Sequence, residues 1–533
     1  MQFKRRLKAL AALGLTMVLL GSTLSGAADK KFNMSFVYFG SSSSYTSYVD
    51  RTQNSLNQIS PSYFNLHSDG SLNLSSALSQ SFIDDMHLRG VEVLPFLSNH
   101  WDYALGVAAL NNRVALAYQI GEVVRAYQLD GIVVDLENLT SAERSAYVDF
   151  IRLLKEALPT GTQISVAVAA NPYGTSSGWQ GSYDYTGLAQ YSDYLMIMAY
   201  DEHYEGGPAG PVASLSFVEK CIAYAVSKVP KEKVVVGLPF YGRIWSNAGG
   251  KPSGYGISNT KTEELIKNYN GKVYTDSASG TSYAVITVGQ SDTKPVIGGT
   301  TLSAGTYTIW YSNEQTLKKM LTLVEKYDIK GTGSWSLGQE TENTWSYYNL
   351  WLNGCYFGDI QYHWAKNAIF SAYQEGWVKG ATTTAYLPDA SLTRAEAAAM
   401  LVRMLGLSGT EVTDESFTDT LNHWAKKEIE TARKYGLIAG VGNNLFEPDS
   451  PITREQMAVI LDKLLGLGYD AELPDIFTDI NQQDNSWSYK AIVTMGQNGI
   501  FKGYPDGGFH PQDTLTRGQM AVLLSTLKVY IRN

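Results

Sequence analysis

The sequence predicts an α/β chain in which a parallel (β/α)8 TIM barrel is followed by a mostly helical trimer of repeats. Three observations predict this architecture. Eight short β-branched runs alternate with amphipathic helical stretches between residue 33 and about residue 352. The connection between the seventh and eighth runs is much longer than the others, which indicates an insertion. A pattern of Trp, Pro and Thr-Arg then recurs three times.

The alternation of strands and helices defines a barrel domain over residues 30–352. The predicted strands are 35–39, 63–66, 91–97, 131–137, 164–169, 194–200, 233–239 and 333–337. The predicted helices between them include 112–127, 142–157, 216–228 and 314–327. Between strands seven and eight, residues 272–309 are rich in Thr, Ser, Tyr and Gly, so we expect a small β insertion beside the barrel mouth.

The amino-terminal segment 1–27 has the layout of a secretory signal peptide. A basic start with Lys4, Arg5 and Arg6 precedes an apolar run over 9–20, and small residues cluster around Ala27. The apolar run is short for a membrane anchor, and no later run reaches the length of a membrane span. We therefore expect a secreted protein with no membrane segment after cleavage.

The composition excludes one class of partner. The 533 residues carry a formal net charge of −9, and only 17% of them are charged, so the basic surface of a general nucleic-acid binder is missing. Aromatic residues make up 12% of the chain, which suits a carbohydrate-handling protein. Cys221 and Cys355 are the only cysteines. A bridge between them stays open, but Cys221 lies in a helical stretch and is interpreted as a buried apolar residue.

The carboxyl-terminal third carries an internal repeat. A Trp recurs at steps of 60 and 63 residues, and a Thr-Arg pair recurs downstream at the same steps. The repeats span 355–408, 414–470 and 474–533. Each Thr stands where an N-cap hydroxyl accepts a hydrogen bond from the free amides of a helix. Each unit is too small to bury its own apolar face, so we expect the three to pack together.

The fourth predicted strand contains the most informative acidic residues. Side chains alternate along a strand, so Val133, Asp135 and Glu137 should point into the barrel, and Ile132 and Val134 should point outward. Active sites of such barrels lie at the carboxyl ends of the strands. Two neighbouring carboxylates repel each other, which raises one pKa and prepares that group as a general acid. A structural pair held by amides or Arg is the alternative.

Three motifs on different strands point to one family. Residues 130–137 read Asp-Gly-Ile-Val-Val-Asp-Leu-Glu, residues 198–201 read Met-Ala-Tyr-Asp, and Trp335 lies on the last strand. In this order they resemble the Asp-Gly-x-x-x-Asp-x-Glu, Met-x-Tyr-Asp and barrel-closing Trp motifs of family 18 glycoside hydrolases. The resemblance covers about residues 33–350. The stretch 201–204 is most similar to the branch that contains spore-cortex and peptidoglycan hydrolases.

The resemblance implies a retaining, substrate-assisted mechanism. Glu137 would protonate the leaving oxygen, while the substrate's own N-acetyl carbonyl attacks the anomeric carbon. Asp135 would orient the N-acetyl group, and Tyr200 would hydrogen-bond its carbonyl. Asp201 would help to hold the sugar, and Trp335 would form an apolar floor beneath it. The implied substrate is a β-1,4 glycan with N-acetylglucosamine at the cleaved position.

One inward position departs from the resemblance. Many chitinases carry an Asp where this chain has Val133. The missing carboxylate removes a like charge and a hydrogen-bond partner, so we expect Asp135 to stay ionised over a wider pH range than in an enzyme with the full acidic stripe.

Other barrel residues are secondary candidates. The side chains that follow strand ends could line the cleft or simply pack loops; these are Tyr38, Asn99, Tyr241 and Arg243. His203 has no second His at ligand spacing, so we expect no metal site, and no cofactor is implied.

The repeats resemble S-layer homology domains, because residues 393–396 read Thr-Arg-Ala-Glu, the motif of that family. The second and third units lose the Glu but keep the Arg. Such trimers bind anionic, often pyruvylated, cell-wall polymers, and a guanidinium offers a planar fork to a carboxylate. The implied polymer-binding arginines are Arg394, Arg454 and Arg517. The tryptophans that could contact sugar, or instead pack as core at helix starts, are Trp364, Trp424 and Trp487.

The sequence therefore favours a secreted, wall-attached glycosidase that cleaves glycans containing N-acetylglucosamine. Peptidoglycan is the favoured substrate, and a chitinase displayed on the cell surface is the first alternative. A non-catalytic carbohydrate-binding protein is the second, although inactive relatives typically lose the acid at the position of Glu137.

Overall fold

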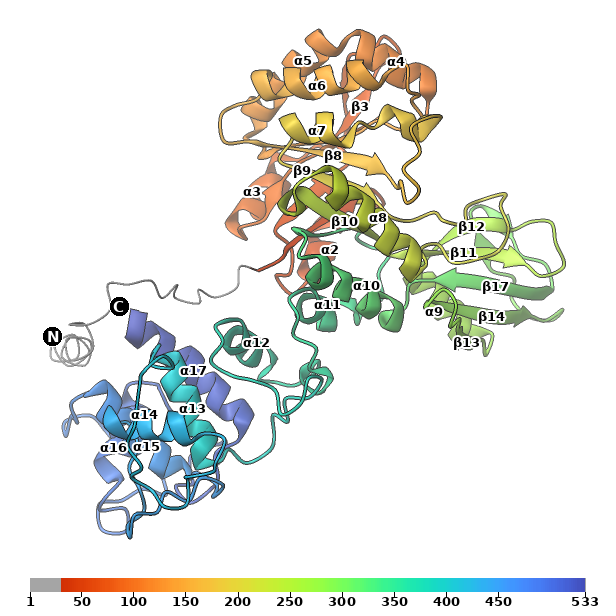
Figure 1. Cartoon of the computed structure of the whole chain (residues 1–533). Helices are drawn as coiled ribbons and strands as arrows, with labels where there is room; N and C mark the ends of the chain where they lie inside the picture. The colour runs from red at the N-terminus through yellow and green to blue at the C-terminus, as the bar shows by residue number, and fades with distance from the viewer. Residues whose placement is uncertain (1–29, 533) are drawn as a thin grey trace. The chain divides into compact units, whose positions relative to one another are not determined.

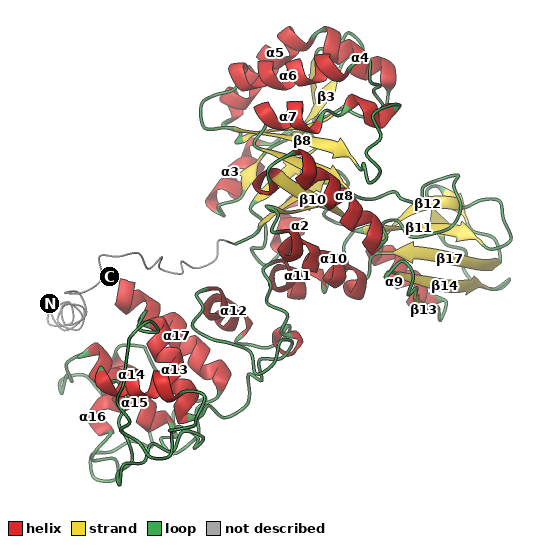
Figure 2. Ribbon diagram, viewed as in Figure 1, coloured by secondary structure: helices red, strands yellow, loops and turns green. Residues whose placement is uncertain are grey.

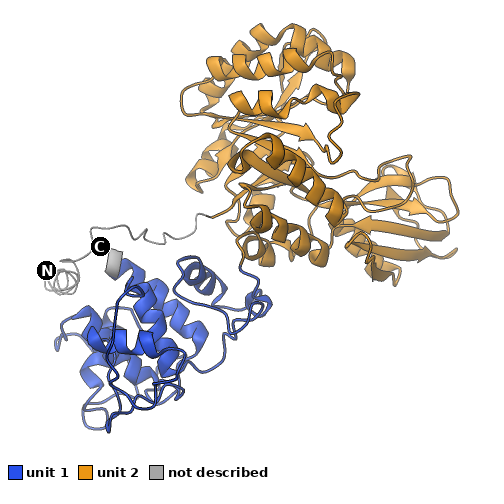
Figure 3. Ribbon diagram, in the orientation of Figure 1, with its two compact units in different colours: residues 1–29, 355–533 blue, residues 30–354 orange. Residues whose placement is uncertain are grey.

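The computed structural model of the chain describes residues 30–532, so the predicted signal peptide lies outside the described residues. They form two compact units, Lys30–Gly354 and the segment from Cys355 onward (Figure 3). Within residues 30–532, no helix has the length and apolar character needed to cross a bilayer. Cys221 and Cys355 are both buried with free thiols, which confirms the interpretation of Cys221 as a buried apolar residue.

The first unit is the predicted parallel barrel (Figures 1 and 2). Its strands, in barrel order, are β1 (Phe32–Val37), β2 and β3 (Gln58–Pro61 and Phe64–Leu66), β5 and β6 (Glu92–Val93 and Phe96–Ser98), β7 (Gly131–Asp135), β8 (Gln163–Ala169), β9 (Tyr194–Met198), β10 (Val234–Pro239) and β18 (Gly331–Trp335). The second and third barrel strands are interrupted. β5 pairs with β2, and β6 pairs with β3 and β7, so the two halves together close the ring.

The second barrel strand begins earlier than predicted. The pattern indicated a start at residue 63, but β2 already begins at Gln58. Gln58 and Ser60 are polar yet fully buried, and Gln58 accepts a hydrogen bond from the Tyr194 hydroxyl at 3.0 Å. Polar residues that point into the barrel break the apolar pattern on which the strand prediction depends.

Helices surround the barrel (Figure 2). They are α2 (Ser42–Asp50), α3 (Gln80–Leu88), α4 (Tyr103–Asn111), α5 (Arg113–Tyr127), α6 (Arg144–Ala157), α7 (Tyr185–Tyr191), α8 (Leu215–Lys228), α10 (Glu314–Tyr327) and α11 (Thr344–Leu352), with 3-10 turns at Trp179–Ser182 and Lys231–Lys233. The four helices predicted from periodicity, α5, α6, α8 and α10, begin and end within two residues of the expected positions. A short β4 (Leu72–Leu74) pairs antiparallel with β3.

The insertion between β10 and β18 is larger than predicted. It is a five-stranded antiparallel sheet with the order β12-β11-β17-β14-β13. Its elements are β11 (Tyr241–Ser246), β12 (Ser253–Ser258), α9 (Asn259–Asn268), β13 (Lys272–Thr275), β14 (Ser282–Val288), β15 (Val296–Ile297), β16 (Thr300–Thr301) and β17 (Gly305–Tyr311). The expected start at residue 272 is wrong because β11 follows β10 after the single residue Phe240, so no turn signal separates the barrel from the insertion.

The second unit contains the three repeats, each with two helices. These are α12 (Lys366–Gln374) and α13 (Arg394–Met404), α14 (Lys426–Lys434) and α15 (Arg454–Leu465), and α16 (Tyr489–Gln497) and α17 (Arg517–Arg532), with a 3-10 turn at Gly358–Ile360. The closest helix pairs join different repeats: α13 packs with α14, α15 with α16, and α17 with α12. The expectation that the units pack together is confirmed, because each repeat completes the core of its neighbour.

The repeats meet at a ring of three main-chain hydrogen bonds. The Leu392 amide donates to the Leu515 carbonyl at 2.7 Å, Leu515 donates to Ile452 at 2.9 Å, and Ile452 donates to Leu392 at 2.9 Å. Directly after this ring, the hydroxyls of Thr393 and Thr453 accept from the third amide of α13 and α15, as the N-cap prediction required. The three Thr-Arg motifs therefore lie around one approximate threefold axis.

Candidate functional site

The acidic strand β7 presents its side chains as the alternation predicts. Val133 lies in the cluster that fills the barrel interior, whereas Ile132 and Val134 pack outward with the helices. Asp135 ends the strand and is only 5% exposed. Glu137 follows on the wall of a cavity of about 550 Å3. Both predicted carboxylates therefore lie at the carboxyl end of the barrel.

The backbone of Glu137 is fixed by a side chain from the neighbouring strand. The Asn99 amide accepts from the Glu137 main-chain N–H at 2.8 Å and donates to the Glu137 carbonyl at 2.9 Å and the Asp102 carbonyl at 2.8 Å. The Tyr183 hydroxyl donates to the Leu136 carbonyl at 3.0 Å. Asn99 is fully buried, so its candidacy as a cleft-lining residue is wrong. It positions the acid instead, because all of its hydrogen bonds are to main chain.

The electrostatics of the pair favour a protonated acid. Burial raises the pKa of Asp135 to about 7. Burial, together with the charges of Asp135 and Asp201, raises the pKa of Glu137 well above its usual range. Asp135 Oδ1 is buried without a hydrogen-bond partner. Burial therefore favours the neutral form of Asp135 in this chain, and the expected comparison with an enzyme that carries an acid at position 133 stays a prediction.

Two predicted site residues, Tyr241 and Arg243, form hydrogen bonds that fix the side chain of Asp201. The Tyr241 hydroxyl donates to Asp201 Oδ1 at 2.8 Å, and the Arg243 Nε and Nη2 groups reach the same oxygen at 2.9 and 2.8 Å. Asp201 lines the cavity, and Oδ2 is the oxygen left for a ligand. Tyr200 lines the cavity beside it, and burial and the nearby carboxylates raise its pKa, so the hydroxyl stays protonated and can donate. Tyr241 and Arg243 thus position Asp201.

An aromatic cluster lies at the end of β18. The Trp335 ring is 5.7 Å from the Tyr38 ring and 5.3 Å from the Phe36 ring, measured between centroids. Tyr38 is 40% exposed, whereas Phe36 is buried in the barrel interior. The structure therefore brings Trp335 and Tyr38 together as an apolar surface above the interior.

The cavity has aromatic walls that the sequence did not reveal. Its lining includes Trp101, Tyr173, Trp179 and Tyr204 in addition to the predicted residues. The rings of Trp101 and Trp179 are 5.2 Å apart in an edge-on arrangement. These residues come from three separate loops, and loop side chains follow no periodicity. The available signal was that Trp101 lies in the same loop as Asn99, four residues after the end of the third predicted strand.

Among residues 30–532, no group of three or more His, Cys, Asp and Glu side chains gathers closely enough to hold an ion. His203 Nδ1 lies 3.0 Å from the Pro211 carbonyl, a contact that accounts for its position.

The three repeat arginines have equivalent partners. Each is at most 6% exposed, and in each the Nε and Nη2 groups donate to two main-chain carbonyls of the next repeat. The carbonyls belong to Phe446 and Ala439 for Arg394, to Phe509 and Lys502 for Arg454, and to Tyr386 and Lys379 for Arg517. Each guanidinium also lies 4.6–4.8 Å from an aromatic centroid of that repeat. The prediction that each guanidinium is free to bind a carboxylate is therefore wrong for its Nε and Nη2 groups, because these groups donate to the neighbouring repeat.

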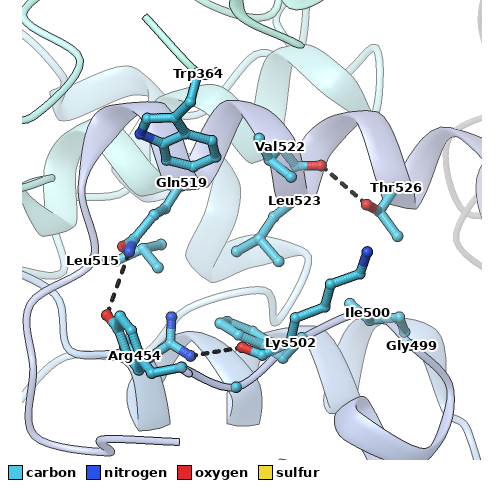
Figure 4. A pocket seen from close by; sticks show the side chains of 13 residues that line it. Trp364, Arg454, Gly499, Ile500, Lys502, Leu515, Gln519, Val522, Leu523 and Thr526 are labelled. Atoms are coloured by element: carbon cyan, nitrogen blue, oxygen red, sulfur yellow. Dashed lines mark hydrogen bonds between the residues drawn. The ribbon is translucent and has the colours of Figure 1, made fainter. Parts of the chain in front are cut away.

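The repeat tryptophans are exposed. Trp364, Trp424 and Trp487 are 65%, 60% and 58% exposed, so the alternative that they are core residues is wrong. Trp364 and Arg454 lie on opposite sides of a cavity of about 300 Å3, with Gln519 between them (Figure 4). An indole face and a guanidinium across one small cavity suit a charged sugar.

Comparison with known proteins decides the family. The sequence model of glycosyl hydrolases family 18 matches residues 34–340, more than half of the chain. The chain belongs to glycosyl hydrolases family 18. The S-layer homology domain model matches residues 356–398, 416–458 and 476–521. Both resemblances predicted from the motifs are confirmed: a family 18 hydrolase barrel is followed by three S-layer homology repeats.

The curated relatives include Bacillus glycosylases and a cellulosome-anchoring protein. The chain is 28% identical over 251 residues to the glycosylase YvbX of Bacillus subtilis, covering 46% of this chain and 69% of that protein. It is 25% identical over 249 residues to the cortical fragment-lytic enzyme of Bacillus subtilis, covering 45% and 54%. It is 31% identical over 147 residues to the cellulosome-anchoring protein of Acetivibrio thermocellus, covering 26% and 32%. The chain thus spans about half the length of the cortical fragment-lytic enzyme.

Solved structures share the fold of the family 18 unit. A chitinase from Chromobacterium violaceum superposes with a TM-score of 0.54 at 23% identity, covering 60% of this chain and 99% of that chain. The Bacillus cereus spore cortex-lytic enzyme SleL superposes with a TM-score of 0.53 at 19% identity, covering 60% and 74%. At these identities, the likeness shows the fold of the barrel.

Proposed function

We propose that the protein is a wall-anchored glycosidase that hydrolyses β-1,4 bonds of glycans containing N-acetylglucosamine, with peptidoglycan as the favoured substrate. The observation that carries this proposal is the arrangement of Glu137. Its raised pKa favours the protonated form, and it lines the same cavity as Tyr200 and Asp201. Asp135 precedes Glu137 by two residues, at the end of β7, and so lies deeper in the barrel.

The geometry supports a substrate-assisted reaction. Glu137 donates its proton to the glycosidic oxygen as the bond from that oxygen to the anomeric carbon breaks. The N-acetyl carbonyl oxygen bonds to the same carbon, so no enzyme nucleophile is required. Asp135 faces the resulting cationic ring and stabilises it, while Tyr200 donates to the acetamido oxygen. Water then attacks the anomeric carbon as its bond to the N-acetyl oxygen breaks and the acetamido group is restored, and Glu137 takes up the proton of the water, which gives net retention.

The aromatic walls indicate where the polymer lies. Trp101 and Trp179 form an edge-on pair in the lining of the cavity, and Tyr173 and Tyr204 are 78% and 59% exposed. Exposed aromatic rings stack well on the apolar faces of sugar rings. We assign these residues to the binding of sugar rings next to Glu137, whose cavity they line.

The favoured substrate follows from the relatives and from the repeats. Relatives bear the names cortical fragment-lytic enzyme and sporulation-specific glycosylase. S-layer homology repeats indicate attachment at the cell surface, where peptidoglycan is the adjacent glycan. In this proposal, the repeats bind an anionic wall polymer through the cavity between Trp364 and Arg454.

One experiment tests the catalytic proposal. The purified protein is incubated separately with peptidoglycan and with chitin oligosaccharides, and the products are identified by mass. Muropeptides with a reducing N-acetylglucosamine support the proposal. Cleavage of chitin alone would replace it with a surface-displayed chitinase. Activity that survives in Glu137→Gln would overturn the assigned mechanism.

A further inference from the structure

A lysine lies at the rim of the barrel cavity without an anionic partner. The Nζ group of Lys220, on α8, is 5.5 Å from the centre of the Tyr173 ring. Tyr173 is largely exposed and lines the cavity that contains Glu137. Lys220 is exposed, and no carboxylate among residues 30–532 pairs with it; its neighbour Glu219 pairs with Lys326 instead. The positive charge of Lys220 is therefore available to a ligand of the cavity.

The ring that Lys220 contacts belongs to a closed turn after β8. The buried Asn171 side chain closes this turn, because its Oδ1 accepts from the Thr175 amide at 2.7 Å and its Nδ2 donates to the Thr175 carbonyl at 2.9 Å. Gly174 has a φ of +68°, a conformation that favours glycine. The main chain on both sides of Tyr173 is thus fixed, so the exposed ring is a preorganised surface for a sugar.

The same face of α8 also contributes to the cavity wall. Phe217 lines the cavity and precedes Lys220 by three residues, so the two side chains are neighbours on one face of the helix. The N-cap residue Ser214 donates its amide and its hydroxyl to Glu202, another lining residue, at 2.6 and 3.0 Å. The first turn of α8 is therefore attached to the wall, and Lys220 follows at its edge.

The charges of the lining leave the rim as the place for a substrate anion. Among the described residues that line the cavity, Glu137, Asp201 and Glu202 are acidic and none is Lys or Arg. Arg243 contacts Asp201 through Nε and Nη2, and its Nη1 donates to a main-chain carbonyl at 2.8 Å, so its donor groups are occupied. The acidic interior disfavours a carboxylate of the substrate, whereas Lys220 attracts it.

We propose that Lys220 is a specificity-determining residue, which binds an acidic substituent of the glycan while the Tyr173 ring packs against the sugar that carries it. This inference rests on the proposed function and deepens it, because peptidoglycan carries acidic groups beside its N-acetylglucosamine and chitin carries none. The ligand is a carboxylate, supplied either by the lactyl group of the neighbouring sugar or by the stem peptide attached there. An ammonium group on a flexible stem can follow a carboxylate to either place.

Kinetics of the full chain on three soluble substrates test the proposal. The substrates are peptidoglycan strands with stem peptides, the same strands after an amidase has removed the stems, and stem-free strands whose lactyl carboxylates are converted to neutral amides. Lys220→Gln should lower kcat/KM on the acidic strands by about two- to fivefold, the range of an exposed ion pair, mainly through KM. The loss should shrink at high salt and be absent on the neutral strands. A loss on stem-free acidic strands assigns the lactyl carboxylate, and a loss confined to stem-bearing strands assigns the peptide.

Lys228→Gln is the matched control. The Lys228 Nζ group, on the same helix, is 5.4 Å from the centre of the Tyr224 ring, and Tyr224 does not line the cavity. The control removes the same charge and the same kind of ring contact, so kcat/KM should stay unchanged on all three substrates. Lys220→Arg keeps the charge and should keep the preference for acidic strands.

The outcomes separate this inference from the function beneath it. If the wild type cleaves the strands and Lys220→Gln cleaves the acidic ones equally well, only the inference is wrong. An equal loss on acidic and neutral strands would likewise overturn it, because Lys220 would then act without recognising charge. A wild-type chain that cleaves none of the strands would overturn peptidoglycan as the substrate, and the inference with it.

Discussion

The barrel and the repeat trimer both contain short charged motifs, but the two regions use them differently. In the barrel, Asp135 Oδ1 has no hydrogen-bond partner, and Glu137 faces an open cavity. In the trimer, two donor groups of Arg394 and of Arg454 are bound to main-chain carbonyls. The motif in the barrel is left available for chemistry, whereas the motif in the trimer mainly holds the fold together.

The physical reason lies in the backbone around each motif. At the end of β7, the neighbouring strands and Asn99 satisfy the main-chain groups, so the acidic side chains are not needed for that purpose. In the trimer, loops such as the one that contains Phe446 leave buried carbonyls that need donors, and the arginines supply them. Substitutions should therefore cost activity in the barrel and stability in the trimer.

Glu137→Gln should show the largest effect on the barrel side. We expect activity to fall by about 10²–10⁴-fold, the usual contribution of a general acid.

The raised pKa of Glu137 means that the folded protein holds a proton which the unfolded chain releases, so the wild type loses stability as pH rises above the usual carboxyl range. The variant should gain a few degrees in Tm at pH 8 and almost nothing at pH 4. Calorimetry at both pH values checks this, and a lower Tm at pH 8 would contradict it.

Arg394→Ala should produce the corresponding effect on the trimer side. It removes two bonds to carbonyls and the contact with Phe446, so we expect a loss of about 2–4 kcal/mol in the repeat unit and unchanged activity of the barrel. Hydrogen exchange over residues 355–532 measures the loss. Arg433→Ala is the matched control, because Arg433 is half exposed and its ion pair with Asp414 is long at 3.9 Å. Equal exchange in the two variants would show that Arg394 is dispensable for the fold.

Asn99→Ala should lower kcat by about 10–100-fold and leave KM nearly unchanged. Asn99 fixes the main chain of Glu137 on both sides, and a small displacement of an acid reduces the rate strongly. The control is Asn138→Ala, which removes a loop hydrogen bond to the Trp101 carbonyl but leaves the Glu137 clamp intact. A change in KM alone would mean that Asn99 acts in binding.

Val133→Asp should produce the smallest effect, a shift in the acid limb of the pH–rate profile. An Asp at this dry interior position would be neutral, and it would lie beside Asp135 on the same face of β7. Its O–H could donate to the unpartnered Oδ1 of Asp135, lowering the pKa of Asp135 from about 7. The acid limb should therefore move to lower pH by about one unit. A shift in the opposite direction would mean that the added group is charged.

Local patterns predicted a large part of both regions. Periodicity located α5, α6, α8 and α10, and alternation on β7 correctly separated Val133 from its outward neighbours. The prediction failed where polar residues point into the barrel, as at Gln58, and where an insertion starts without a turn, as at Tyr241. In both places the local pattern carries no sign of the distant segments that surround the strand.

The sequence by itself determined the order of the motifs, the inward face of β7 and the threefold recurrence of the Thr-Arg pair. Only the tertiary structure decided which charged atoms remain free. Asn99 reaches Glu137 across 38 residues, and Glu396 reaches Arg517 across 121. A hydrogen-bond partner so far along the chain leaves no local pattern, because backbone periodicity constrains the direction of a side chain but not the atom that it meets.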